Sequence, residues 1–592
     1  MSGQERTDAS IVRLLWPWIR PNARVLGIAQ LIGLLGAAAG LASPLATKSV
    51  VDGWSDRPSL NGPVGVLLGL LATSLVLSVA QQMVLAWVGT HTVERARTLV
   101  ADSLVRVKMS ELTGRPRGEL VSRITADPPL LREATSTGVV GILTSVCTVV
   151  GSVVLMARLD AVLLLVALLA ITAIAVLIAL IQRPAARSFE QTQVAVARIG
   201  ATLDGIIGAL RTVKTSNAQD RNAALMRDHA KAATKHSFRA TLAESAGAAV
   251  ASAGIQLAIL AVLGVGALRV GAGDLTTATL VAFLLYLVLL VPPASDLARN
   301  IVGLQAGAAA ARRINAILTL EPERRTGEIA PSSGVLRVAN ASLTYPGATG
   351  PALRELSLAF PERGHCAIVG PSGAGKTSVL SLLLGLVDPD DGAVLIGSRD
   401  LRELSLTSVR DQIGYVEQAA PLLAGTVRDN LSIRHPGATD DELWTALAAV
   451  GLADRLRMLP QGLDSPIAAD LLSGGESQRI ALARMMIRPP RISILDEATA
   501  QLDAVTELVA ADVVHRAARH GLVITVAHRL STVLDADRIF VMEHGRLLAA
   551  GRHLELMSTC ALYVDLVQAL RIGPDASAPD TTSLSIRVGS HR

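Results

Sequence analysis

The sequence is poor in cysteine and in aromatic residues. Its 592 residues include only 3 Cys, 5 Trp, 4 Tyr and 5 Phe. Cys147, Cys366 and Cys560 lie far apart, without the spacing of a zinc site or of a disulfide framework, so neither is expected. Because aromatic residues make up 2% of the chain, a ligand cavity with aliphatic walls is favoured over an aromatic one.

Charge is absent from long parts of the first half. Half of the residues are hydrophobic (50%) and the mean hydropathy is +0.45, too apolar for an ordinary soluble protein of this size. Buried helices of soluble proteins usually have about 10–14 residues, whereas a membrane crossing needs about 20. Six stretches without Asp, Glu, Lys or Arg reach that length: Val25–Thr47, Val64–Thr90, Ala134–Ala157, Ala161–Gln182, Ser245–Leu268 and Leu275–Ser295. They predict an all-α membrane domain of six spans.

Basic residues are concentrated in two of the loops between these spans. The loop 91–133 contains Arg95, Arg97, Arg106, Lys108, Arg115, Arg117, Arg123 and Arg132. The loop 183–244 contains Arg183, Arg187, Arg198, Arg211, Lys214, Arg221, Arg227, Lys231, Lys235 and Arg239. The loops on the other side contain Lys48, Arg57, Arg158 and Arg269. Because cytoplasmic loops carry the excess of Lys and Arg, both long loops and both termini are expected in the cytoplasm.

The overall charge is explained by the same topology. The net charge of +5 comes mainly from the membrane-facing loops, so we expect a lipid bilayer and no nucleic acid as partner. Arginine far outnumbers lysine and alanine is frequent, which is typical of a GC-rich bacterial genome. The expected location is therefore the cytoplasmic (inner) membrane of a bacterium.

Composition divides the chain into five segments. We predict an N-terminal interfacial segment at 1–24, where Ile11–Arg20 forms a short amphipathic helix, and a membrane domain at 25–320. A charged linker at 321–333 precedes an α/β domain at 334–571, and the Ser/Pro/Asp-rich tail 572–592 is expected to be disordered. The two basic loops are too long for turns, and their periodicity predicts that the membrane helices continue beyond the spans.

A phosphate-binding loop opens the α/β domain. The sequence GPSGAGKT (370–377) follows an apolar strand, Cys366–Val369, and precedes a stretch with helical periodicity. We expect Lys376 to reach the β- and γ-phosphates and Thr377 to bind Mg²⁺. The predicted nucleotide-binding residues of this segment are Gly370, Pro371, Ser372, Gly373, Ala374, Gly375, Lys376, Thr377 and Ser378.

Two further motifs carry chemistry. A second apolar strand, Ile492–Leu495, ends at Asp496, a candidate Mg²⁺ ligand through water, and at Glu497, a candidate base that polarises the attacking water. The segment LSGGE (472–476) precedes a helix-forming run. Ser473, Gly474 and Gly475 are therefore expected at a helix N-terminus, where backbone N–H groups bind an anion.

The P-loop, LSGGE and ISILDE (492–497), in that order, resemble the ATPase of the ABC (ATP-binding cassette) family. The resemblance implies that Gln418 in IGYVEQ senses Mg²⁺ and the γ-phosphate, that His528 is the switch histidine, and that Tyr345 stacks on adenine. It also implies that LSGGE, with Glu476, contacts the γ-phosphate held by a second subunit, and that Asp503 is the aspartate of the family's S-A-L-D loop. The implied cofactors are ATP and Mg²⁺.

The membrane half carries the same resemblance. Gly118–Asp127 (GELVSRITAD) is similar to the first intracellular loop of ABC exporters, and Leu203–Arg221 is similar to the second. One departure is SPIAAD (465–470), which replaces the usual G-E-R-G-like turn before the signature and is shorter. Gln30, Gln81, Gln82 and Gln256 lie inside the spans, where they either line a cavity or form hydrogen bonds between helices.

From about residue 11 to 571 the chain resembles a half-size exporter of the type IV fold, with six membrane helices and one nucleotide-binding domain. Because LSGGE completes the site of another subunit, the resemblance implies a dimer, either with an identical chain or with a different one. The expected function is ATP-driven export of a hydrophobic or amphipathic small molecule, lipid or peptide. Import of a metal chelate by the same fold is the alternative, and an ATP-gated channel or a soluble-type ABC ATPase is less expected.

Overall fold

The structure is a computed structural model, and it describes residues 11–52, 61–467, 472–496, 504–527 and 533–571. The chain divides into two compact units. The helical unit comprises Met1–Asp102 and Pro116–Thr319, and the α/β unit comprises Ser103–Arg115 and Leu320–Arg592. The disordered tail predicted at 572–592 lies outside the described residues.

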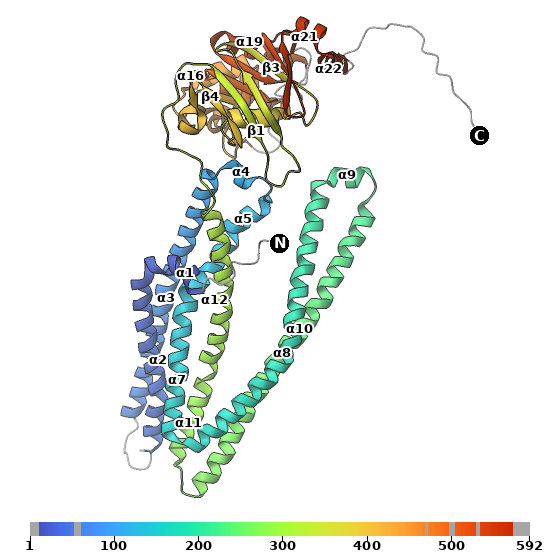
Figure 1. The fold of residues 1–592 in the computed structure, drawn as a ribbon. Coiled ribbons are helices and arrows are strands. Elements are labelled where there is room, and N and C mark those ends of the chain that lie inside the picture. Colours follow the sequence, from blue (N-terminus) through green and yellow to red (C-terminus); the bar gives the residue numbers. More distant parts are fainter. Residues whose placement is uncertain (1–10, 53–60, 468–471, 497–503, 528–532, 572–592) are drawn as a thin grey trace, which may run out of the picture. The chain divides into compact units, whose positions relative to one another are not determined.

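The helical unit contains long helices joined by short connections (Figure 1). Its helices are α1 (Ile11–Ile19), α2 (Ala23–Asp52), α3 (Asn61–Arg106), α5 (Arg117–Thr125), α6 (Asp127–Glu133), the π-helical turn η2 (Ala134–Gly138), α7 (Val139–Leu159), α8 (Ala161–Gly208), α9 (Leu210–Thr215), α10 (Gln219–Gly271), α11 (Thr277–Leu289) and α12 (Val291–Leu318). The end of α3 and the short helix α4 (Met109–Leu112) belong to the α/β unit.

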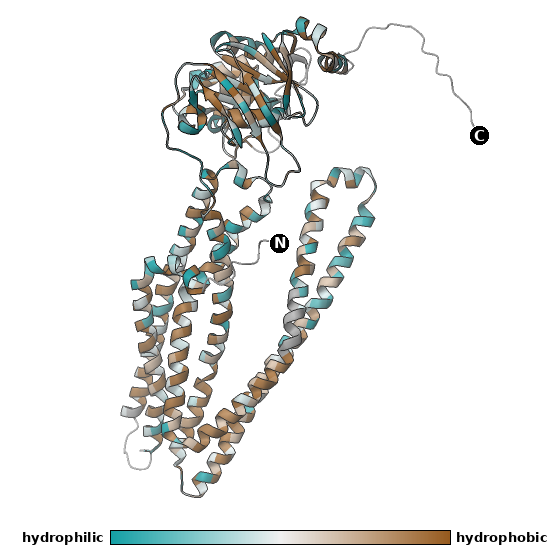
Figure 2. Ribbon diagram, in the orientation of Figure 1, coloured by the Kyte–Doolittle hydropathy of each residue, from teal (hydrophilic) through white to brown (hydrophobic). Residues whose placement is uncertain are grey.

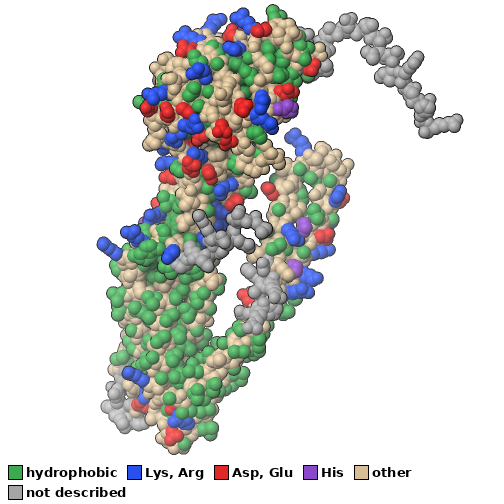
Figure 3. Space-filling view, in the orientation of Figure 1, with side chains coloured by type: hydrophobic (Ala, Val, Ile, Leu, Met, Phe, Trp, Pro, Cys, Tyr) green, Lys and Arg blue, Asp and Glu red, His purple; other side chains and the backbone are tan. Residues whose placement is uncertain are grey.

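Within the described part of the chain, six helical stretches are long and apolar enough to cross a membrane, and each overlaps one predicted span. They are Ile11–Asp52, Val64–Arg106, Gly118–Leu159, Ala161–Ile181, Gln219–Gly271 and Thr277–Leu318. Apolar residues run along these helices, and their side chains form a continuous hydrophobic surface (Figures 2 and 3). The protein is therefore a multi-pass membrane protein, and the predicted all-α fold of this half is confirmed.

The helices of this unit form two packed groups. Helices α8 and α10 lie side by side over much of their length, and both run well beyond the apolar spans, as predicted (Figure 1). In the other group α2 and α12 pack on α7, and Gln30 Nε2 of α2 donates to Thr144 Oγ1 of α7 at 3.2 Å. This glutamine thus bonds between helices. Small residues permit close approach, because a Cβ on Gly307 of α12 would lie 2.1 Å from Ala134 Cβ.

The α/β unit contains two sheets. In the larger sheet the strand order is β10-β9-β3-β8-β7-β6, with parallel pairing from β9 to β6 and antiparallel pairing of β10 with β9. The smaller, antiparallel sheet has the order β2-β1-β4-β5. The strands are β1 (Leu336–Leu343), β2 (Leu353–Ala359), β3 (Gly364–Val369), β4 (Asp391–Ile396), β5 (Arg399–Asp400), β6 (Ile413–Val416), β7 (Ile492–Asp496), β8 (Leu522–Val526), β9 (Arg538–Glu543) and β10 (Arg546–Gly551).

Helices surround the larger sheet. They are α13 (Lys376–Leu383), α14 (Leu406–Asp411), α15 (Val427–Ser432), α16 (Asp440–Ala449), α17 (Ala453–Arg457), α18 (Gly474–Met486), α19 (Ala504–His520), α21 (His553–Thr559) and α22 (Ala561–Arg571). Every residue of β7 and β8 is buried, which explains why most of their residues are apolar. The α/β fold predicted for this half is confirmed.

Candidate nucleotide-binding site

The P-loop connects β3 to α13, which confirms the predicted strand–loop–helix arrangement. All three of its glycines, Gly370, Gly373 and Gly375, have positive φ, a conformation that other residues rarely adopt. Gly370 has φ 156° and a Cβ there would lie 2.3 Å from Met542 O, while Gly375 has φ 97° and a Cβ would lie 2.8 Å from Ala352 O. Glycine at these positions therefore lets the loop pack directly against the neighbouring backbone at Met542 and Ala352.

The remaining P-loop residues leave the loop polar and open. Lys376 is 7% exposed, and its Nζ donates to Gly370 O at 2.7 Å and to Pro371 O at 3.1 Å, so the ammonium group lies over the loop. Ser372, Gly373 and Thr377 are exposed, whereas Ala374 and Ser378 are buried beneath them. Gly375, the N-cap of α13, has no side chain to cap the helix, so backbone N–H groups remain available to phosphate.

The parallel strands bring further polar residues to the edge of the sheet beyond the P-loop. Asp496 is buried at the end of β7, and Gln418 is exposed in the turn that follows β6, the neighbouring strand. Parallel strands end at the same edge, which is where open α/β sheets bind ligands. Asp496 is therefore placed where a Mg²⁺ ion beside the phosphates could be held.

Tyr415 of β6 belongs to this edge and was missed by the sequence analysis. Its hydroxyl donates to Asp496 Oδ2 at 3.5 Å, and burial, together with the negative charge of Asp496, raises the pKa of the phenol. In the sequence, only its position three residues before Gln418 could have indicated that Tyr415 lies near the site. In the structure, Tyr415 is paired with Ile494 of the neighbouring strand β7.

Tyr345 lies in the loop after β1, half-buried against the core of the α/β unit. The neighbouring Thr344 N–H donates to Asp390 Oδ2 at 2.7 Å, which fixes the start of this loop. The phenol ring is thereby held on a stable support next to a cavity of about 240 Å³.

The LSGGE segment begins helix α18. Ser473 is the N-cap: its Oγ accepts from Glu476 N at 3.2 Å, and its N–H donates to Glu476 Oε2 at 2.8 Å, which completes a capping box. Arg455 Nε donates to Glu476 Oε1 at 2.8 Å. Burial opposes the ionised form of Glu476, but these bonds outweigh it and lower its pKa. The first N–H groups of the helix, at Gly474 and Gly475, have no acceptor within the helix and suit an anion.

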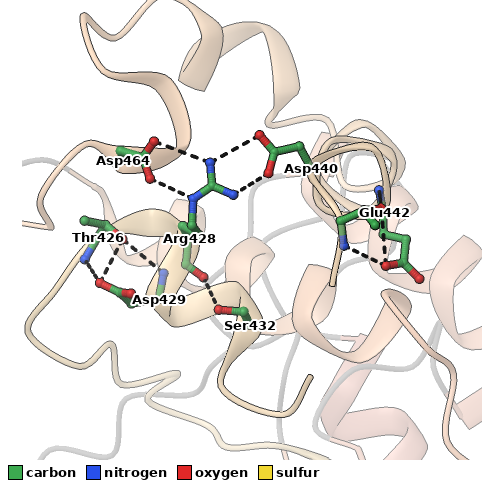
Figure 4. A network of polar contacts seen from close by, with 8 residues as sticks. Thr426, Arg428, Asp429, Ser432, Asp440, Glu442 and Asp464 are labelled. Atoms are coloured by element: carbon green, nitrogen blue, oxygen red, sulfur yellow. Dashed lines mark hydrogen bonds and ion pairs between the residues drawn. The ribbon is translucent and has the colours of Figure 1, made fainter. Parts of the chain in front are cut away.

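One arginine, Arg428, joins several segments between Gln418 and LSGGE. Arg428 of α15 lies between Asp440 and Asp464, with Nε donating to Asp464 Oδ1 at 2.7 Å (Figure 4). The first half of SPIAAD lies beside the same helix, because Val427 N donates to Ser465 O at 3.1 Å. The shortened segment is thus attached to the start of α15.

Several predicted residues fall outside the described part of the chain. These are Glu497, Asp503 and His528, together with residues 468–470, the second half of SPIAAD. Their predicted roles remain predictions.

Three charged residues of the motif GELVSRITAD form successive ion pairs along helices of the helical unit. Arg123 NH2 donates to Glu119 Oε1 at 2.7 Å, and Arg123 NH1 donates to Asp127 Oδ2 at 3.2 Å, each four residues apart. Asp127 is buried and accepts two bonds from Arg313 Nε of α12, at 3.1 and 3.2 Å. The spacing of the motif therefore serves to tie α5 and α6 to α12.

Comparisons with known proteins agree with this site. Residues 26–293 match the family described as "ABC transporter transmembrane region", and residues 353–500 match the family described as "ABC transporter". A fatty acid ABC transporter ATP-binding/permease protein of Mycobacterium tuberculosis is 31% identical over 535 residues, which cover 89% of this chain and 84% of that protein. The chain belongs to the ABC transporter family. As a half-size ABC transporter it hydrolyses ATP and couples hydrolysis to transport.

Other relatives of the transporter are similar over almost the whole chain. An ATP-dependent lipid A-core flippase of Methylococcus capsulatus is 29% identical, covering 92% of this chain and 91% of that one. A multidrug resistance ABC transporter of Lactococcus lactis subsp. lactis is 27% identical, covering 93% of both. A solved bacterial Atm1-family ABC exporter with ATP bound has a TM-score of 0.79 at 25% identity, covering 94% of this chain and 99% of that chain. The transporter thus has the fold of ABC exporters, and the importer alternative is not favoured.

Proposed function

We propose that the protein is a dimeric exporter that moves an anionic, lipid-like amphiphile across the cytoplasmic membrane of a bacterium, with both termini in the cytoplasm. The observation that carries the substrate class is an aliphatic crevice in the helical unit. The orientation is supported by the excess of Lys and Arg in the two long loops.

In the catalytic cycle we assign the phosphates to Lys376 and the P-loop backbone, and adenine to Tyr345. Thr377, Asp496 and Gln418 would hold Mg²⁺, which when bound would neutralise charge on the phosphates. Glu497 takes up a proton from the attacking water, and His528 orients the γ-phosphate. Ser473, Gly474, Gly475, Glu476 and Asp503 face the nucleotide of the other subunit.

The dimer is supported by an unpaired apolar surface outside the spans. On the extensions of α8 and α10, Leu203 is 44% exposed, Ile207 62% and Leu225 45%. Large apolar side chains are rarely this exposed together in water unless another protein surface covers them. A second subunit would cover this surface and would also supply the LSGGE half of each site.

The crevice lies between α8, α10, α11 and α12 and has a volume of about 230 Å³. Its walls are aliphatic except for one hydroxyl, with residues such as Ile174, Ala251 and Leu287 and without a charged side chain. Such walls favour an alkyl chain over a polar or aromatic group.

A basic surface lies farther along the same hairpin. Arg227, Lys231, Lys235 and Arg239 recur every four residues on α10 and line one hollow with Phe238. Among the described residues that line this hollow there is no carboxylate. An amphiphile with a carboxylate or phosphate head would neutralise this charge.

Reconstitution into liposomes tests the substrate class. Fluorescent phosphatidylglycerol is added to the leaflet on the side of the α/β unit, and dithionite then measures the label that ATP has moved to the protected leaflet. We expect transport by wild type, a loss of at least fivefold in Ala251→Phe, which fills the crevice, and no loss in Ala248→Phe, an exposed position on the same helix. Equal effects of the two variants, or no ATP-dependent protection, would reject a lipid-like substrate.

A further inference from the structure

The linker that leaves α12 is paired with the chain that leaves α3. Lys108 N donates to Glu321 O at 3.0 Å and Glu323 N donates to Arg106 O at 2.7 Å, with an antiparallel bridge between Val107 and Pro322. A further ion pair, Lys108 Nζ to Glu321 Oε1 at 2.6 Å, reinforces this short ladder. The two connections are therefore bound to each other within the α/β unit.

The same linker is joined to the P-loop helix by one arginine. Arg410 of α14 binds Glu323 through both guanidinium NH2 groups, at 2.7 and 2.9 Å. Its Nε donates to Leu384 O at 3.2 Å and its Nη2 to Gly385 O at 3.2 Å. Leu384 is the C-cap of α13, and Gly385 is the residue after it. A cation at a helix C-terminus is favourable, and a bidentate Arg–carboxylate pair fixes orientation as well as distance.

These contacts form a continuous path. The N-terminus of α13 carries the P-loop, and its C-terminal carbonyls are bonded to Arg410. Arg410 is bonded to Glu323, and the backbone of Glu323 is bonded to Arg106, the last residue of α3. A helix of eight residues is about 12 Å long and moves as a rigid rod, so a shift at the phosphate end is carried to the other end.

We propose that Arg410 and Glu323 are positioning residues that transmit movement of the P-loop helix to the end of α3 through the linker. Neither residue belongs to the P-loop, to Asp496 or to LSGGE, so hydrolysis does not require them. Glu323 lines the cavity beside Tyr345, and Glu323→Gln keeps the size of the side chain there. The pair is half-buried, with Arg410 34% and Glu323 23% exposed, which shields it from competition by water and salt. The inference rests on ATP-coupled transport alone and is independent of the substrate.

The chain offers a matched control in the same linker. Glu328 pairs with Arg399 at 3.2 Å, but both side chains are largely exposed, at 59% and 49%, and the pair does not reach α13. Glu328→Gln therefore makes the same chemical change as Glu323→Gln without interrupting the path.

Spin labels measure the coupling directly in the full-length protein in liposomes, in a Cys147→Ser background. Two labelled samples are prepared. In one the label replaces Leu99 on α3, and in the other it replaces Leu554 on the α/β unit; both positions are exposed. Distances between the two protomers are compared without nucleotide and with ATP and vanadate. We expect Glu323→Gln and Arg410→Lys to keep the change at Leu554 and to keep basal ATPase within about twofold, but to lose more than half of the change at Leu99. Glu328→Gln should behave as wild type.

A double-substitution cycle tests whether Glu323 and Arg410 act through their mutual contact or through two independent structural effects. If the residues act through one path, Glu323→Ala with Arg410→Ala reduces the Leu99 response no more than either single substitution. Additive losses, an unchanged Leu99 response in the single variants, or a loss at Leu554 and Leu99 together would overturn the proposal. Absence of any distance between protomers would reject the dimer instead.

Discussion

The buried carboxylate of the GELVSRITAD motif provides the sharpest prediction about stability. The side chain of Asp127 is 3% exposed and accepts from Arg313 and Arg123, whose side chains are 38% and 16% exposed. Asp127→Asn keeps the shape but removes the charge that both guanidinium groups require. Breaking a buried ion pair usually costs about 3–5 kcal/mol. Because Arg313 is more than a third exposed, water recovers part of this, and we expect about 2 kcal/mol.

The assay is thermal unfolding of the purified protein in detergent. In domains of about 150–250 residues, each kcal/mol of lost stability lowers the Tm by about 2–4 °C. Asp127→Asn should therefore lower the Tm by about 5 °C. Asp296→Asn is the matched control on α12: its partner Arg299 is 78% exposed and Asp296 itself 45%. Such a surface pair contributes about 0–1 kcal/mol, so the control should melt within about 2 °C of wild type. Equal Tm values for both variants would refute the importance of burial here.

Three further outcomes are expected. Gly307→Ala places a Cβ 2.1 Å from Ala134 Cβ and 2.8 Å from Leu130 O. The cost of this clash exceeds the helix-propensity gain of about 1 kcal/mol, so the Tm should fall. Gly264→Ala is the control, because a Cβ there has nothing within 4 Å, and it should not lower the Tm. Burial lowers the pKa of His365 to about 4, so the unfolded chain binds its proton first as pH falls below 6.5. Between pH 6.5 and 4.5 the free energy of unfolding, measured by urea titration, should therefore fall by about 2 kcal/mol more in wild type than in His365→Gln. An equal fall in both proteins would contradict this. Lys231→Gln with Lys235→Gln should raise the KM for fluorescent phosphatidylglycerol at least threefold without changing that for phosphatidylcholine, whereas Arg221→Gln, on the same helix outside the hollow, should change neither.

The sequence predicted those features that depend on local pattern. Apolar runs without charge predict the spans, and Gly370–Thr377 between an apolar strand and a helix predicts the phosphate loop, because glycine and backbone N–H groups must occupy those positions. The start of α18 at Gly474 likewise follows from a Ser and a Glu three residues apart, the pattern of a capping box.

Contacts between distant segments could not be predicted in this way. Asp127 and Arg313 are 186 residues apart, and Glu323 and Arg410 are 87 residues apart, so no periodicity links them. Tyr415 reads as an ordinary strand residue until the parallel pairing of β6 with β7 brings it to Asp496. Such partners depend on tertiary packing rather than on local propensity.

The most direct test of the account is vectorial transport driven by the proposed base. Liposomes containing wild type or Glu497→Gln, with the α/β unit outside, receive fluorescent phosphatidylglycerol in the outer leaflet, with or without ATP. We expect that both proteins bind ATP equally, and that only wild type, with ATP, moves label into the dithionite-protected leaflet at many times the background rate. Equal transport by Glu497→Gln, or equal movement of label into the protected leaflet with and without ATP, would contradict ATP-driven export.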